Sequence, residues 1–161
     1  MNIIEQDILN VSSGIICHQV NCRGKMGAGL AKQIADRYPQ AKSSYELECR
    51  IRTPENLLGD IATAKIYDDL WVVGLFAQLD YGREPGKCYT GYFSLVQSLV
   101  RLQAMRGNPR CAFHNFPVYI PYGMGAGLAG GDWKKIEKIL EVFIEDAVLC
   151  RRPSSATDRT F

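Results

Sequence analysis

Two short stretches of the sequence combine closely spaced glycines with polar residues, a pattern that suits the binding of an anion. The first is VNCRGKMGAGLA at residues 20–31, and the second is PYGMGAGLAGGD at residues 121–132. Glycine lets main-chain N–H groups approach a ligand closely and adopts positive φ at little cost. Because N–H groups at the start of a helix carry partial positive charge, two such loops at one sheet edge could hold a diphosphate from both sides.

Each loop could instead be only a tight connection between a strand and a helix. The two loops share a Gly-Ala-Gly core, at residues 27–29 and 125–127, and this repetition favours the binding interpretation. Neither loop is a Walker A motif, because no Gly-Lys-Ser/Thr ending is present. The first loop also fails the Rossmann pattern, since GAGLAK at residues 27–32 lacks the third glycine and follows the second expected strand rather than the first. A kinase or a dehydrogenase is therefore disfavoured.

The apolar patterns around these loops predict the elements that position them. Continuous apolar, β-branched runs predict buried strands, and apolar residues at intervals of three and four predict helices. Two capping residues are expected, Thr90 for the helix over 93–102 and Asp132 for the last helix. The expected strands cover 2–8, 15–20, 61–67, 70–77, a run ending at 117–123, and 147–150; the expected helices cover 30–38, which Pro39 ends, 93–102, and 133–143.

Strands that alternate with helices predict a three-layer α/β/α fold with a central mixed, mostly parallel sheet. Ligands in such sheets collect at the carboxyl ends of strands, where both glycine loops are expected to lie. We expect one domain over residues 1–150. The remaining residues 151–161, RRPSSATDRTF, are polar without periodicity, and we expect a disordered tail.

Composition excludes several other classes of protein. The chain has 161 residues, 47% hydrophobic and 22% charged, with a net charge of +2, so charge does not indicate a nucleic-acid or membrane partner. No apolar run approaches the ~20 residues that span a bilayer, and Glu5 and Asp7 interrupt any secretory signal. The six cysteines include no CxxC pair, so no metal site is expected. These features predict a cytoplasmic monomer without a cofactor.

The motifs VNCRGKMGAGLA and PYGMGAGLAGGDW, in this order, resemble the macrodomain family. The resemblance covers roughly residues 1–150. The segments HQVNCRGKMGAGLAKQIADRYPQA and LFAQLDYGREPGKCYTGY are most similar to the branch that contains ADP-ribose-1″-phosphate phosphatases and terminal ADP-ribose glycohydrolases.

The resemblance implies that the ligand is ADP-ribose. Asp7 would accept a hydrogen bond from the adenine amino group, although a turn-capping role is equally open. Asn21 would bind the distal ribose hydroxyls, and N–H groups of the second loop would bind the diphosphate. The implied ligand-binding residues are Asp7, Ile8, Asn21, Met26, Gly27, Ala28, Gly29, Phe76, Tyr122, Gly123, Met124, Gly125, Ala126, Gly127 and Leu128.

Two residues are candidates for catalysis. The phosphatase-like branch has a histidine at the position of His18, and a neutral imidazole beside a phosphomonoester could act as a general acid or base. Strand alternation nevertheless places His18 and Asn21 on opposite faces, and a buried structural histidine is the alternative. Asp132 could deprotonate the attacking water or only cap the last helix.

The resemblance therefore implies hydrolysis of ADP-ribose-1″-phosphate to ADP-ribose and phosphate. The alternatives are a glycohydrolase that acts on ADP-ribosylated protein or nucleic acid, and a non-catalytic reader of ADP-ribose. The glycohydrolase members carry a lysine where this chain has Gln78 and an acid where it has Ala129, which makes that activity less favoured. A modest basic group could contact nucleic acid or be only a solvated face: Arg23, Lys25, Arg83 and Lys87.

Overall fold

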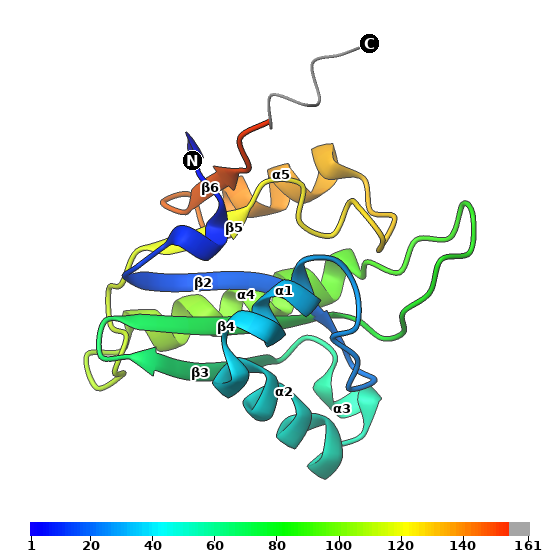
Figure 1. The fold of residues 1–161 in the computed structure, drawn as a ribbon, viewed down its shortest axis with the longest axis horizontal. Helices are drawn as coiled ribbons and strands as arrows, with labels where there is room; N and C mark the ends of the chain where they lie inside the picture. The colour runs from blue at the N-terminus through cyan, green and yellow to red at the C-terminus, as the bar shows by residue number, and fades with distance from the viewer. Residues whose placement is uncertain (155–161) are drawn as a thin grey trace.

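The computed structural model describes residues 1–154, which form a six-stranded sheet covered by helices (Figure 1). The order across the sheet is β1-β6-β5-β2-β4-β3. The strands are β1 (Asn2–Glu5), β2 (Gly14–Asn21), β3 (Ile61–Tyr67), β4 (Leu70–Gln78), β5 (Val118–Pro121) and β6 (Val148–Arg151).

All neighbouring strands run parallel except β3, which pairs antiparallel with β4. The antiparallel pair joins the expected strands 61–67 and 70–77 in a hairpin, with Asp68 and Asp69 at its turn. The sheet is therefore mixed and mostly parallel, as expected. Its parallel strands send their carboxyl ends to one edge.

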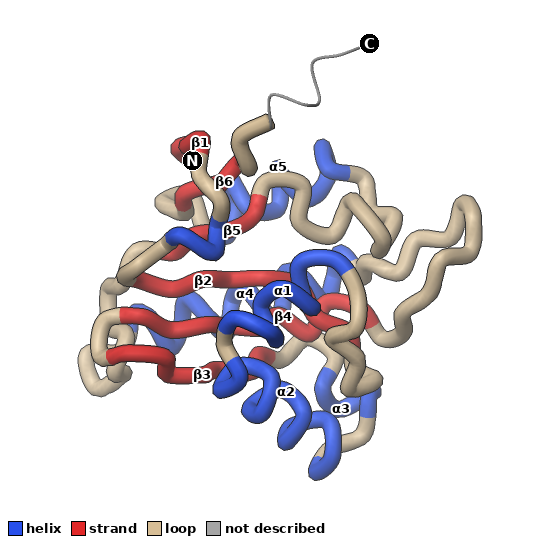
Figure 2. The backbone as a smooth tube through the Cα atoms, in the orientation of Figure 1, coloured by secondary structure: helices blue, strands red, loops and turns tan. Residues whose placement is uncertain are grey.

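Helices cover both faces of the sheet, which confirms the three-layer architecture (Figure 2). One face carries α1 (Gly29–Arg37), α2 (Pro39–Ile51), α3 (Pro54–Leu57) and a short 3₁₀ helix η1 (Ile8–Asn10); the other carries α4 (Tyr92–Gly107) and α5 (Trp133–Phe143). The protein has one hydrophobic core on each face of the sheet, and alternate residues of β2 pack into them. Ile16 packs in the core beneath α1 and α2, and Ile15 packs in the core beneath α4 and α5.

Several boundaries differ from the sequence prediction. The first strand ends at Glu5, and the next residues turn into η1. Pro39 ends α1 but also opens α2, a helix the sequence analysis missed, because proline fits the first position of a helix. Helix α4 is preceded by Gly91, so Thr90 is not its cap. Of the predicted tail, Arg151 belongs to β6 and residues 152–154 have no regular secondary structure; residues 155–161 lie outside the described residues.

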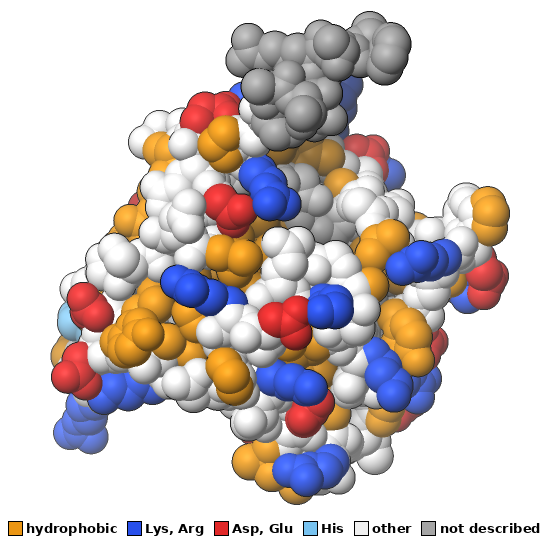
Figure 3. Space-filling view, viewed as in Figure 1, with side chains coloured by type: hydrophobic (Ala, Val, Ile, Leu, Met, Phe, Trp, Pro, Cys, Tyr) orange, Lys and Arg blue, Asp and Glu red, His pale blue; other side chains and the backbone are white. Residues whose placement is uncertain are grey.

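The surface shown in Figure 3 mixes positive and negative side chains without a large patch of one sign. Over residues 1–154, no helix combines the length and apolar character that crossing a membrane requires. In the same residues, no group of three or more histidine, cysteine or acidic side chains is arranged to hold a metal ion.

Candidate functional site

The two glycine loops follow neighbouring parallel strands and therefore meet at one edge of the sheet. The first loop follows β2, and the second follows β5, which pairs with β2 through Ile15↔Val118 and Ile16↔Tyr119. The loops lie close together, because Leu128 Cδ1 is 3.5 Å from the position that a Cβ on Gly29 would take. The sequence-based expectation that the loops face each other is confirmed.

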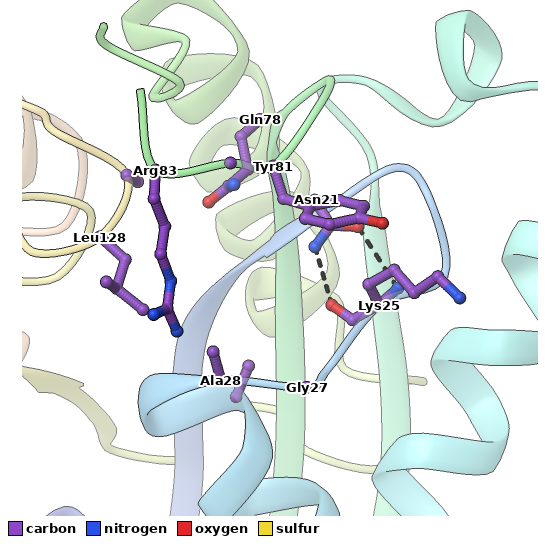
Figure 4. Close-up of a pocket in the computed structure, with 11 residues that line it drawn as sticks. Asn21, Lys25, Gly27, Ala28, Gln78, Tyr81, Arg83 and Leu128 are labelled. Atoms are coloured by element: carbon purple, nitrogen blue, oxygen red, sulfur yellow. Dashed lines mark hydrogen bonds between the residues drawn. The ribbon is translucent and has the colours of Figure 1, made fainter. Parts of the chain in front are cut away.

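A cavity of about 410 Å³ opens between these loops and the segment that follows β4 (Figure 4). Asn21 and Gln78 form its floor, where β2 and β4 end side by side. The complete lining is Asn21, Lys25, Gly27, Ala28, Ala31, Gln78, Tyr81, Gly82, Arg83, Leu128 and Ala129. No carboxylate and no imidazole occurs among these described lining residues.

Asn21 organises the first loop as well as lining the cavity. Its Nδ2 donates to the Lys25 carbonyl oxygen at 2.7 Å, and its Oδ1 accepts from the Arg23 N–H at 2.9 Å. The Tyr45 hydroxyl of α2 lies 2.8 Å from the Asn21 carbonyl oxygen and accepts the Lys25 N–H at 2.9 Å. The side-chain amide of Asn21 has two N–H donors, and these bonds use one of them. The second is left to donate a hydrogen bond to a ligand.

A register shift between Val20 and Asn21 explains how Asn21 reaches α2. In a regular strand these consecutive side chains would point to opposite faces. Here both are on the α1/α2 side, since Val20 packs in that core and Asn21 contacts Tyr45. A β-bulge re-aims a side chain in this way, and sequence periodicity does not reveal it.

The start of α1 is free to bind an anion. Ala28 occupies the N-cap position with extended backbone (φ −147°, ψ 162°), but its methyl group makes no capping hydrogen bond. The N–H groups of the first turn of a helix lack intrahelical partners and carry partial positive charge. Because Ala28 lines the cavity, these N–H groups are beside it.

The second loop also leaves main-chain donors without partners. Gly123, Gly125 and Gly130 have φ of 80°, 75° and 67°, values that glycine adopts easily. The Ala126 N–H is used within the turn, donating to the Gly123 carbonyl oxygen at 3.0 Å. Among the hydrogen bonds of residues 1–154, the N–H groups of Gly127 and Leu128 have no acceptor. A phosphate oxygen would satisfy them.

A chain of polar side chains connects the second glycine loop, through β2, to the end of β4 and the segment after it. Gln19 Nε2 donates to Thr90 Oγ1 at 3.0 Å and to Gln78 Oε1 at 2.9 Å. Thr90 Oγ1 donates to the Gly125 carbonyl oxygen at 2.7 Å, and Gln78 Nε2 donates to the Asp80 carbonyl oxygen at 3.0 Å. Thr90 therefore fixes the second loop instead of capping α4. Sequence analysis did not identify Gln19, because a single polar residue in an apolar strand has no characteristic pattern.

Asp7 lies farther along the same edge, after β1. Its Oδ1 accepts the Leu9 N–H at 3.0 Å and caps η1, while its Oδ2 is 3.3 Å from Nε of Arg152. The neighbouring Arg151 places its guanidinium 4.3 Å from the ring centre of Tyr122. The alternative capping role of Asp7 is thus present, and one carboxylate oxygen faces an arginine.

His18 is not brought to the cavity. Its side chain is buried in β2 with 3% exposure, and Nδ1 has no hydrogen-bond partner among the described residues. Burial lowers the pKa of His18 from 6.5 to about 4. A buried imidazole that does not line the cavity is typical of a core residue, and the assignment of His18 to proton transfer stays a prediction.

Several predicted ligand contacts are also core residues. Phe76 is fully buried and stacks on Tyr45 with ring centres 5.7 Å apart, so it cannot pack against a ligand ring. Ile8 and Met26 belong to the core on the α1/α2 side, and Met124 belongs to the other core. The sequence pattern of a large apolar residue at a strand end is the same whether its side chain faces a ligand or the core.

Asp132 has the capping role. Its Oδ1 accepts the Lys134 N–H at 2.9 Å at the start of α5, and its own N–H donates to the Tyr92 hydroxyl at 2.9 Å. The side chain is exposed and does not line the cavity. Asp132 therefore has the helix-capping role, and its part in catalysis stays a prediction.

The cavity thus contains Asn21, Gly27, Ala28 and Leu128 from the predicted set. It also contains residues that the sequence analysis had assigned no ligand contact. Four of these come from the segment after β4 or the end of β4 itself: Gln78, Tyr81, Gly82 and Arg83. Gln78 was noted in the sequence only as the position of a family lysine, and Arg83 only as part of a basic group. Tyr81 and Gly82 had no signal beyond the polar, glycine-rich composition of residues 80–89, which is typical of any exposed loop.

Comparison with solved structures defines the class of protein. The chain superposes on the macrodomain of Mycobacterium tuberculosis DarG with a TM-score of 0.71 and 24% identity, over 96% of this chain and 97% of that one. It superposes on Thermosipho africanus DarTG in complex with ADP-ribose with a TM-score of 0.71 and 16% identity, over 94% of this chain and 41% of that one. The chain has the macrodomain fold.

One protein of known activity is similar to this chain in sequence. Over 151 residues, the chain is 29% identical to the ADP-ribose 1″-phosphate phosphatase of Saccharomyces cerevisiae strain YJM789, covering 82% of this chain and 85% of the relative. No protein-family model matches the chain. The resemblance to macrodomains of the ADP-ribose-1″-phosphate processing type is thus confirmed.

Proposed function

We propose that this protein binds ADP-ribose along the carboxyl edge of its sheet and hydrolyses ADP-ribose-1″-phosphate to ADP-ribose and phosphate. The observation that carries the proposal is the contact between the two glycine loops. Gly29 and Leu128 lie against each other, and both loops present N–H groups to the space beside them. Such paired amides match the oxygens of a diphosphate.

The strand order supports the orientation of the ligand. Asp7 follows the outer strand β1, the glycine loops follow β5 and β2, and Gln78 ends β4. An extended ligand with adenine at Asp7 would place its diphosphate between the loops and its distal ribose beside Asn21. The similarity to the yeast phosphatase supports a phosphate on that ribose as the group that is transferred to water, with the ribose oxygen as the leaving group.

Catalysis by this site would depend on charge stabilisation and positioning. Phosphoryl transfer involves little covalent chemistry for the protein, and fixed N–H dipoles stabilise the charge that develops. The described cavity lining offers neither an imidazole nor a carboxylate to move a proton. We expect slow turnover, because unaided phosphomonoester hydrolysis is very slow.

The same absence of an acid or base in the described lining favours a second candidate, a binding module that recognises ADP-ribose without cleaving it. A further possibility is the release of ADP-ribose from modified protein or nucleic acid. No described lining residue supports that activity beyond Lys25 and Arg83, whose cationic side chains could attract a charged substrate.

The test is to incubate the purified protein with ADP-ribose-1″-phosphate and measure free phosphate. Parallel reactions contain ADP-ribosylated protein or ADP-ribosylated DNA and follow free ADP-ribose. Calorimetry measures ADP-ribose binding by the same preparation. Phosphate release supports the proposal, and release of ADP-ribose alone assigns the glycohydrolase. Binding without any product assigns the reader. Absence of ADP-ribose binding overturns the proposal.

A matched variant distinguishes true activity from a contaminant. Ala28→Asp places a carboxylate among the N–H groups of α1 and should weaken ADP-ribose binding about 5- to 1,000-fold and lower phosphate release with it. His18→Leu and Asp132→Ala should retain phosphate release, since neither side chain lines the cavity. Loss of release in those two variants, with ADP-ribose binding intact, would restore their assignment as catalytic residues.

A further inference from the structure

The charges around the cavity are unevenly compensated. Arg23 forms an ion pair with Asp80 at 2.6 Å, and Lys87 forms one with Glu84 at 3.2 Å. The ion pairs found within residues 1–154 do not include Lys25 or Arg83, the two cations that line the cavity. Since the described lining contains no carboxylate, these two side chains give the cavity a net positive charge. An anion is the chemical class that such a cavity takes.

The position of Arg83 is set by contacts with the second glycine loop. Its segment, residues 79–91, projects from the body of the protein between β4 and α4 (Figure 1). The Tyr89 N–H donates to the Ala129 carbonyl oxygen at 2.7 Å, and the Tyr89 hydroxyl lies against Gly82 so closely that a Cβ there would overlap it. The same hydroxyl accepts the Glu84 N–H at 3.4 Å. The residues on both sides of Arg83 are thus held by Tyr89.

The side chain of Arg83 reaches back toward the loops. Figure 4 shows it extending along the cavity, with its guanidinium between Leu128 of the second loop and Ala28 of the first. Lys25 points the other way, out of the cavity. Arg83 is therefore the cation at the place where the two sets of unpartnered N–H groups converge.

We propose that Arg83 binds the diphosphate of the ligand from the open side, opposite the main-chain N–H groups of the two glycine loops. The proposal depends on ADP-ribose being the ligand. A guanidinium presents a planar fork of donors that matches two phosphate oxygens, and a diphosphate carries more charge than the loop dipoles neutralise. Arg83 then closes the third side of the diphosphate site and acts as a binding residue.

The test compares Arg83→Gln with a control that changes the charge equally. Arg110→Gln is suitable, because Arg110 is exposed and lies beyond the far end of α4, a 16-residue helix that begins beside the cavity edge. Calorimetry with ADP-ribose at low salt should give about 10- to 100-fold weaker binding for Arg83→Gln, the range for a lost charge-assisted hydrogen bond. Arg110→Gln should bind like the wild type. Arg83→Lys should lie between them, because lysine keeps the charge but not the fork.

A second ligand tests which phosphate Arg83 contacts. Binding of ADP-ribose-1″-phosphate should weaken by the same factor as binding of ADP-ribose, since both contain the diphosphate. A loss confined to the 1″-phosphorylated ligand overturns the assignment to the diphosphate. Equal affinity of Arg83→Gln and Arg110→Gln for ADP-ribose overturns any ligand contact by Arg83 and leaves the proposed function intact. Failure of the wild type to bind ADP-ribose refutes the proposed function itself.

Discussion

The uncapped start of α1 allows a substitution that should stabilise the fold while destroying the site. Ala28 has the extended backbone of an N-cap residue but no side-chain acceptor. Asp is among the best N-cap residues, and Ala is among the poor ones. Ala28→Asp should therefore raise the free energy of unfolding by about 1 kcal/mol, the usual difference between these residues.

The same carboxylate would repel a bound diphosphate. Two unit charges ~4 Å apart repel by about 1 kcal/mol in water and about 4 kcal/mol at the effective dielectric constant of a protein surface. Ala28 lines the cavity, so the true value lies between these limits. Affinity for ADP-ribose should fall by about 5- to 1,000-fold, since 1.4 kcal/mol corresponds to a factor of ten.

Urea unfolding and calorimetry measure the two effects on the same preparations. Ala28→Ser is the control, because serine caps the helix without adding charge. It should be stabilised by a similar amount and lose much less affinity than Ala28→Asp. If Ala28→Asp binds ADP-ribose as tightly as Ala28→Ser, the N–H groups of α1 do not contact the diphosphate. If Ala28→Asp unfolds more easily than the wild type, the reasoning about the cap is wrong.

Three further predictions concern residues at other positions. Burial lowers the pKa of His18 from 6.5 to about 4 in the folded protein, so His18 takes up a proton at higher pH in the unfolded chain than in the folded one. The free energy of unfolding should therefore fall as the pH drops from 6.5 to 4. Near pH 5 the wild type should lose about 2 kcal/mol relative to His18→Leu, measured by urea unfolding across pH. Asp132→Ala removes the cap of α5 and should cost about 1 kcal/mol of unfolding free energy without changing phosphate release. Gly125→Ala forces alanine to φ 75° with its Cβ 2.7 Å from Gln19 Oε1, and it should lower the melting temperature and weaken ADP-ribose binding. Gly107→Ala, where a Cβ meets nothing within 4 Å, is its control and should do neither.

The parts of the site that local sequence determines could be predicted. The two Gly-Ala-Gly cores mark turns between a strand and a helix, and adjacent parallel strands bring their carboxyl ends together. Asp132 directly precedes an amphipathic pattern and caps that helix as expected. The hairpin of β3 and β4 follows from two apolar runs around a pair of aspartates.

Residues whose roles depend on tertiary contacts could not be predicted from the same patterns. His18 is polar, yet the helices on its face bury it. Threonine is a common helix cap, but the Thr90 hydroxyl donates a hydrogen bond to the Gly125 carbonyl oxygen instead. This contact joins segments that are far apart in the sequence. Arg83 reaches the cavity only because Tyr89 holds its segment against Ala129. Sequence spacing does not encode such contacts.

The pairing of Arg152 with Asp7 has a practical consequence for protein engineering. Strand β6 delivers its final residues to the same edge as the proposed adenine position, whereas β1 begins with Asn2 at the opposite edge. A reporter inserted directly after Arg152 would start near that nucleobase site, and one fused ahead of Met1 would start a full strand length away. Labelling at the amino end is the arrangement that should leave nucleotide recognition undisturbed.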